Sequence, residues 1–192
     1  IFEGLAMSSN VFFWTMGVEY LGADTISEYA QRFGFGSTTG IDLPEEVPGL
    51  VPSPEWKRRS LNNPWVGGDT ANFSIGQGYL AVTPLQLANM VSLIVNDGVV
   101  YVPRVLKEVR DQVTGEVLRE TKPEVLFQMS ARSETFELVR EAMRQVITDG
   151  TAEVVITTPA VEVAGKTGTG EIGSDEAWHS WFVAYAPYET AN

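Results

Sequence analysis

A lysine, two hydroxyls and a glycine are clustered late in the chain, in the run Ala164-Gly165-Lys166-Thr167-Gly168-Thr169. On a strand beside a cleft, Lys166 would supply a point charge, and Thr167 and Thr169 would supply hydroxyl donors, a set that suits a carboxylate ligand. Gly168 would leave the backbone bare, so that an extended peptide could add to the strand edge. A solvated turn with ordinary strand threonines is the alternative interpretation.

A second polar group, Ser8-Ser9-Asn10, lies near the other end of the chain, where a segment with helical spacing begins. A Ser-x-Asn tripeptide is common by chance, and its simplest interpretation is a helix start that is capped by a serine side chain. Each of the two groups is therefore a weak signal by itself.

The composition excludes several classes of function. The 192 residues are 44% hydrophobic and 20% charged, which predicts a folded globular protein. A formal net charge of −12 disfavours nucleic acid and anionic lipid surfaces as partners. Without cysteine, and with His179 as the single histidine, we predict no disulfide, no metal site and no cofactor. The first residues lack the features of a signal peptide, and no apolar run could span a membrane, so we expect any anchor to lie outside this sequence.

Helices are expected to dominate the first part of the chain. Residues 8–20 form a plausible helix with few charges, which we expect to lie largely inside a core. A second helix follows from Asp24 to Phe33, and residues 37–80 read as a long irregular region with a short helix that begins at Ser53-Pro54. Thr83-Pro84 opens the clearest helix, which Gly98 ends.

Strands and one further helix follow. We predict a β-hairpin at residues 99–120. In it, the strand-like residues 99–102 and the segment that continues to Val109 would pair with residues 116–118 across a turn. An amphipathic helix is expected from Ser133 to Thr148, and two strands, 161–169 and 178–186, flank a turn at 170–175. This order predicts an α+β fold with helices packed on an antiparallel sheet.

Taken together and in this order, Ser-x-Asn and Lys-Thr-Gly resemble the second and third signatures of penicillin-binding proteins and serine β-lactamases. The surrounding sequence narrows the resemblance to class B penicillin-binding proteins of the cell-elongation type, the penicillin-binding protein 2 family. The segments that carry it are Ile41-Asp42-Leu43-Pro44, Pro52-Ser53-Pro54-Glu55-Trp56, Gly68-Asp69-Thr70, Ser74-Ile75-Gly76-Gln77-Gly78, Val82-Thr83-Pro84-Leu85-Gln86-Leu87-Ala88 and the closing strand from Trp181 to Tyr188. Within the sequence, only residues 99–160 contain no segment that resembles the family.

The family's first signature, Ser-x-x-Lys, is absent, because no serine or threonine here has lysine three positions later. In the family this signature precedes Ser-x-Asn. We therefore expect residues 1–192 to be part of one transpeptidase domain of the penicillin-binding and serine β-lactamase type, incomplete at both ends. The Ser-x-x-Lys segment and the last strand would lie outside it. A degenerate relative that has lost the nucleophile is the alternative.

The resemblance implies a D,D-transpeptidase that cross-links cell-wall stem peptides through an acyl-serine intermediate and binds β-lactams. It implies a proton relay at Ser8 beside the positive field of Lys166, and a hydrogen bond from Asn10 to the substrate amide. It also implies that Thr167 and Thr169 bind the terminal carboxylate, next to the bare backbone of Gly168, and that the Thr169 N–H completes an oxyanion hole. Without the nucleophile, this chain alone should be inactive.

Two rival functions also fit these motifs. A D,D-carboxypeptidase or β-lactamase would use the same motifs but deliver the acyl group to water, and a penicillin-sensing scaffold would not turn over. By resemblance, the expected partners are stem peptides, β-lactams, a membrane glycan polymerase and shape-determining proteins, at the extracytoplasmic face of the bacterial cytoplasmic membrane.

Several other residues receive a structural interpretation. We expect His179 to be structural or at the solvent edge. Trp56 and Trp65 are expected to pin their loop to the core. The run 74–78, with Asp69 and Asn72 before it, is expected to form tight turns and receives no catalytic role.

Overall fold

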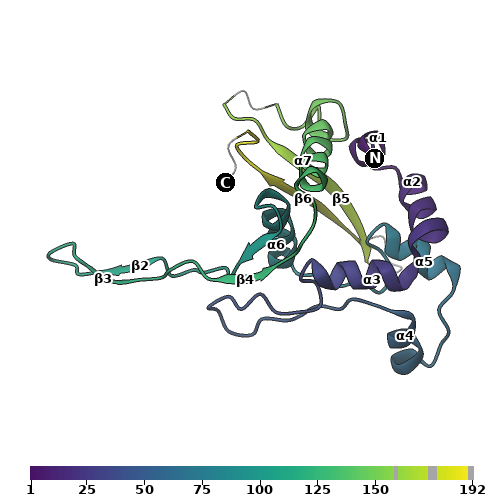
Figure 1. The fold of residues 1–192 in the computed structure, drawn as a ribbon, viewed down its shortest axis with the longest axis horizontal. Helices are drawn as coiled ribbons and strands as arrows, with labels where there is room; N and C mark the ends of the chain where they lie inside the picture. The colour runs from purple at the N-terminus through teal and green to yellow at the C-terminus, as the bar shows by residue number, and fades with distance from the viewer. Residues whose placement is uncertain (158–159, 173–176, 190–192) are drawn as a thin grey trace.

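The computed structural model describes residues 1–157, 160–172 and 177–189. Its helices and strands alternate in blocks along the chain (Figure 1). The helical elements are α1 (Phe2–Ala6), α2 (Asn10–Thr15), the π-helix η1 (Met16–Leu21), α3 (Gly22–Arg32), α4 (Pro54–Leu61), α5 (Gly67–Ser74), α6 (Pro84–Val95) and α7 (Ser133–Thr148). The strands are β1 (Val99–Tyr101), β2 (Glu108–Arg110), β3 (Val117–Glu120), β4 (Val125–Gln128), β5 (Ala164–Ile172) and β6 (Ala177–Tyr185).

The strands pair as three antiparallel ribbons, β1–β4, β2–β3 and β5–β6. The longest ribbon, β5–β6, runs in unbroken register from Ala164 opposite Tyr185 to Ile172 opposite Ala177. α6 and α7 both contact this ribbon, whereas β2–β3 projects away from the rest of the fold (Figure 1). The predicted α+β architecture is confirmed.

The predicted hairpin at 99–120 is only partly correct. β2 and β3 do pair within it, with Glu108 opposite Glu120. β1 pairs instead with β4, which was not predicted, with Val99 opposite Gln128. The projecting ribbon β2–β3 is inserted between β1 and β4 in the sequence. The apolar residues 99–101 therefore pair with a strand that lies beyond the turn from which the hairpin was predicted.

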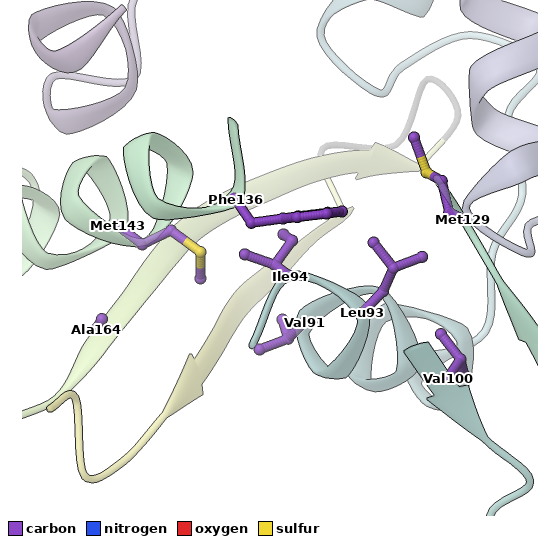
Figure 2. Close-up of a cluster of buried hydrophobic side chains, with 8 residues drawn as sticks. All are labelled: Val91, Leu93, Ile94, Val100, Met129, Phe136, Met143 and Ala164. Carbon is purple, nitrogen blue, oxygen red and sulfur yellow. The ribbon is translucent and has the colours of Figure 1, made fainter. Parts of the chain in front are cut away.

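The main core lies where α6, α7, β1 and β5 meet. Its buried residues include Leu93, Val100 and Ala164, all fully inaccessible, and Phe136 of α7 lies beside Ile94 of α6 (Figure 2). α6 starts as predicted, because the Thr83 hydroxyl accepts the Gln86 N–H at 3.1 Å while the Gln86 carboxamide accepts the Thr83 N–H at 2.9 Å. This core fixes β5 against α7.

The helix expected at 8–20 is confirmed with a shifted start, but its expected burial in a core is wrong. Ser9 is the N-cap, with its hydroxyl accepting the Phe12 N–H at 3.3 Å, so α2 begins at Asn10 and passes into η1. Val11 and Val18 are exposed by 68% and 45%. The buried residue of η1 is Gly17, and α2 has none. Gly17 lies against Ser74 of α5 so closely that a Cβ would stand 1.8 Å from the Ser74 hydroxyl oxygen. The small number of charged residues in this segment therefore did not predict its burial correctly.

The long region 37–80 contains the predicted short helix and one that was missed. Ser53 caps α4 by accepting the Trp56 N–H at 3.1 Å. α5 was not predicted, because Gly67, Gly68 and its polar residues are weak helix formers. Two tertiary contacts stabilise it: Phe73 is buried, and Asp69 pairs with Lys57 at 2.6 Å. Asp69 also accepts the Val66 N–H at 2.8 Å, a local contact at the start of the helix.

The closing hairpin is confirmed with shifted boundaries. β5 begins at Ala164 rather than 161 and continues through Ile172, beyond the predicted end at Thr169. Residues 173–175 of the predicted turn lie outside the described residues. Within the part of the chain that the structure describes, no helix is both long and apolar enough to cross a membrane.

Candidate active site

The structure brings the two polar motifs together. Lys166 Nζ donates to Ser8 Oγ at 2.9 Å and to the Thr167 carbonyl at 2.8 Å. Lys166 lies on β5, and Ser8 lies in the turn between α1 and α2. Because Ser9 takes the capping role, the Ser8 hydroxyl is available for a contact across the fold.

Ser8 has a backbone conformation that is unusual for its residue type. Its φ of +53° is in the left-handed region, which costs a non-glycine residue about 1–2 kcal/mol. Such strain persists only where surrounding structure holds it, and it gathers at active sites and ligand clamps. Here it coincides with the hydrogen bond to Lys166, which supports a functional interpretation of this turn.

Lys166 lies in a partly buried position beside the cleft-facing turn of Ser8. Burial lowers the pKa of its ammonium group below the ordinary value of 10.5. Among the described residues no carboxylate forms an ion pair with it. An ammonium group of this kind can attract a ligand carboxylate and can exchange a proton with a neighbouring hydroxyl more readily than an exposed lysine.

The two threonines differ in their surroundings. Thr167 Oγ1 lies 2.7 Å from Thr151 Oγ1 and 3.4 Å from Lys166 Nζ, whereas Thr169 is exposed. A Cβ added at Gly168 would meet only Trp181, at an ordinary contact distance of 3.5 Å. The fold itself therefore does not require glycine at 168, which leaves close approach of a ligand as an explanation for it.

All six predicted site residues line one cleft with a cavity volume of about 1150 Å³. Asn10 lies at this cleft, and within the described residues its side chain forms no hydrogen bond, so its amide is available to a ligand. The cleft runs between β5 on one side and the α1–α2 turn and the end of α5 on the other. Its lining includes Ser8, Asn10, Phe13, Trp14, Asn72, Gln77, Thr151, Lys166, Thr167, Gly168, Thr169, Glu171 and Trp178.

Sequence reasoning assigned no role to five polar residues of this cleft, of which Thr151 and Gln77 hydrogen-bond to β5. The other three are Asn72, Ser74 and Glu171. Thr151 follows the end of α7, and no spacing signal distinguishes it from other threonines. Gln77 donates from Nε2 to the Thr169 carbonyl at 3.1 Å. The pair of glycines around Gln77 was the available signal, because it indicates a turn built to place one side chain.

Three residues that received a structural interpretation, His179, Trp56 and Trp65, do not line the cleft, whereas Asn72 and Gln77 do. His179 is exposed, with its ring 6.2 Å from that of Trp181, and it does not line the cleft. Trp56 packs on Tyr79 with ring centroids 5.3 Å apart, and Trp65 Nε1 donates to Thr70 Oγ1 at 2.8 Å. Trp65 also packs against the core cluster of Phe35, Val51 and Phe73, as expected. The ring that Trp56 contacts belongs to the same long region.

Comparison with known proteins identifies the class. The sequence matches the family described as "Penicillin binding protein transpeptidase domain" over residues 1–192. It is 36% identical over 199 residues to the peptidoglycan D,D-transpeptidase MrdA of Acinetobacter baumannii, covering 96% of this chain and 29% of that protein.

Two solved structures share the fold. The complex of penicillin-binding protein 2 (PBP2) and MreC from Helicobacter pylori has a TM-score of 0.83 at 28% identity, covering 98% of this chain and 33% of the other. A peptidoglycan synthase complex that coordinates polymerization and crosslinking has a TM-score of 0.84 at 29% identity, covering 98% of this chain and 31% of the other.

The chain therefore belongs to the penicillin binding protein transpeptidase domain family. Its relatives make it a transpeptidase domain sequence of the PBP2 type. It spans about a third or less of the length of the MrdA and synthase-complex chains that it matches.

Proposed function

We propose that this chain is part of one transpeptidase domain of a peptidoglycan D,D-transpeptidase that cross-links cell-wall stem peptides and is acylated by penicillins. The observation that carries the proposal is the 2.9 Å hydrogen bond between Lys166 Nζ and Ser8 Oγ, which joins the Lys-Thr-Gly strand to the Ser-x-Asn turn. Family membership and similarity to MrdA support it.

The nucleophile of the proposed reaction is a serine of a Ser-x-x-Lys segment elsewhere in the full-length polypeptide, since residues 1–192 contain no such motif. Its oxygen attacks the carbonyl carbon of the D-alanyl-D-alanine peptide bond, a C–O bond forms, and the C–N bond breaks. The terminal D-alanine leaves with the proton that the serine gives up. An acceptor amine then attacks the acyl carbon, a new C–N bond forms, and the C–O bond to the serine breaks. The proton that the amine gives up returns to the serine oxygen. Residues 1–192 alone are inactive in this account.

Each cleft residue has a proposed part in that sequence. Ser8 relays the proton between the nucleophile and the leaving amine, because Lys166 donates to its oxygen and leaves its O–H directed elsewhere. Thr167 and Thr169 hold the terminal carboxylate in the field of Lys166, and Gly168 keeps the strand edge open. The Asn10 amide bonds the substrate backbone, and the Thr169 N–H is one of the oxyanion donors.

Partners and location are proposed from the relatives. PBP2 of Helicobacter pylori forms a complex with MreC, and the synthase complex combines polymerization with crosslinking. We therefore propose a shape-determining protein and a membrane glycan polymerase as partners of the full-length protein. We also propose a position at the extracytoplasmic face of the cytoplasmic membrane, with an anchor outside residues 1–192.

The experiment that tests this function supplies the full-length protein with a D-alanyl-D-alanine donor peptide and a separate amine acceptor. Mass spectrometry should detect free D-alanine and a donor–acceptor product in equal amounts. Free D-alanine with only the hydrolysed donor would identify a carboxypeptidase instead. Folded protein that releases no D-alanine would favour a scaffold and contradict the proposal.

A further inference from the structure

The run Ser74-Ile75-Gly76-Gln77-Gly78 ends in the cleft but has no part in the function proposed above. Gly76 and Gly78 have φ of +77° and +81°, a region that favours glycine. A Cβ at Gly76 would meet nothing within 4 Å, so this glycine is needed for backbone conformation rather than for space. The Gln77 N–H also donates to the Asn72 carbonyl at 2.9 Å. The turn therefore fixes where the Gln77 side chain begins.

From this turn, Gln77 reaches across the cleft to β5. Its Nε2 donates to the Thr169 carbonyl at 3.1 Å. Within the described residues β5 pairs only with β6, so the edge that faces the cleft has no strand partner. In a β-strand the N–H and C=O of one residue point to the same edge, so the Thr169 N–H also faces the cleft. Gln77 thus forms a hydrogen bond with the Thr169 carbonyl, one of the main-chain groups on this unpaired edge of β5.

A glutamine carboxamide carries an N–H donor and a carbonyl acceptor, the same two groups as a peptide unit. Peptides that add to a strand edge bind through such main-chain hydrogen bonds. We propose that Gln77 is a placeholder for the ligand backbone: it occupies the Thr169 carbonyl in the free protein and gives it up to an amide N–H of the bound peptide or penicillin. This inference rests on the proposed function, in which the acyl donor lies along β5.

The exchange requires the side chain to move rather than the turn. Phe73 is buried at the end of α5, and the Lys57–Asp69 ion pair of 2.6 Å holds the start of the same helix. Gln77 itself is only partly buried, and Thr169 is exposed. Rotation of one carboxamide into solvent is therefore enough to open the carbonyl.

Removing the carboxamide donor should favour ligands that carry an amide N–H. The free variant would no longer satisfy the Thr169 carbonyl internally, so the ligand would not have to compete for it. A neutral hydrogen bond of this kind corresponds to about a three- to tenfold change in an equilibrium constant. The dissociation constant of the complex that precedes acylation should fall by that factor, and the rate of the acylation step should stay the same.

The test follows acylation of the full-length protein by a fluorescent penicillin in stopped flow, which separates the two constants. The variants are Gln77→Met, which keeps the length but cannot donate, and Gln77→Ala. Gln112→Met, at an exposed glutamine in the β2–β3 turn, is the matched control. A carbapenem, which lacks the acylamino N–H, is the second probe, measured in competition with the penicillin.

We expect both Gln77 variants to bind the penicillin about three- to tenfold more tightly before acylation, with unchanged affinity for the carbapenem. An unchanged or weaker penicillin complex would overturn the placeholder role, as would an equal effect on both probes. If the wild-type protein forms no acyl-enzyme at all, the proposed function fails and this inference fails with it. Normal wild-type acylation with unaffected variants refutes the inference alone.

Discussion

Lys166 is the residue whose substitution tests the site most sharply. We expect Lys166→Ala in the full-length protein to slow acylation by a fluorescent penicillin by at least about 10²-fold, because the proton relay and the field that attracts the carboxylate are both lost. Lys166 has no carboxylate partner among the described residues, so the melting temperature should change little. Lys107→Ala, at an exposed lysine before β2, is the control. Normal acylation of Lys166→Ala would exclude its proposed role.

Ser8 allows stability and activity to be separated. Its positive φ predicts that Ser8→Gly is more stable than Ser8→Ala by about 1 kcal/mol, because glycine tolerates this conformation. Both variants lack the hydroxyl, so both should acylate about 10²-fold more slowly than wild type. Urea unfolding and stopped-flow acylation of the two variants check this pair of outcomes. If Ser8→Ala retained full acylation, the relay would have to be assigned to another group.

At the residue scale, the types and order of the motif residues predicted which side chains share a cleft, but not how they interact. The Lys166–Ser8 hydrogen bond depends on the α1–α2 turn, where capping by Ser9 leaves Ser8 available. Thr151 could not be predicted, because its contact with Thr167 arises from the packing of α7 on β5. The bond from Gln77 to Thr169 likewise joins segments that are distant in the sequence.

At the scale of elements, the Lys57–Asp69 pair connects α4 to α5. Lys57 is almost fully buried, and its hydrogen bond with Asp69 raises the pKa of its ammonium group. Burial by itself would raise the pKa of Asp69, but the hydrogen bonds from Lys57 and the Val66 N–H outweigh it and hold that pKa below the ordinary 3.8. Each partner therefore stabilises the charged form of the other.

This pair predicts a particular pH dependence of stability. Because the folded pKa of Asp69 is depressed, its contribution is present above about pH 4 and is lost as the pH falls toward the folded value. Urea unfolding of the full-length protein, followed by tryptophan fluorescence from pH 3 to 7, should show wild type more stable than Asp69→Asn at pH 7, with a smaller difference at pH 3. A difference that does not change with pH would refute this coupling.

The elements also show where sequence patterns succeed and fail. α6 and α7 were predicted because their apolar periodicity coincides with capping residues or a glycine stop. α5 was missed because tertiary contacts override its weak local propensity, and β1 was given the wrong partner because a longer insertion separates it from β4. The prediction that residues 8–20 are buried was wrong, because apolar residues on a helix do not show whether another part of the fold packs on them.

At the scale of the whole molecule, residues 1–192 leave much apolar surface uncovered. Val11, Trp14, Val18 and Leu21 are exposed by 37–68%, and a groove of about 580 Å³ lies between α6 and β6. An exposed face of this extent favours association. We expect the isolated chain to aggregate or to melt without a cooperative transition in circular dichroism and size-exclusion chromatography. A sharp two-state melt of a monomer would refute this expectation.

In the proposed function, this chain is the carboxylate-binding and relay half of an acyl-serine transpeptidase site. The most direct test is intact-mass spectrometry of the full-length protein after exposure to a penicillin, followed by peptide mapping of the adduct. We expect one covalently bound drug molecule, on a serine of a Ser-x-x-Lys motif of the full-length polypeptide outside residues 1–192. An adduct on Ser8, or folded protein that forms no adduct, would contradict it.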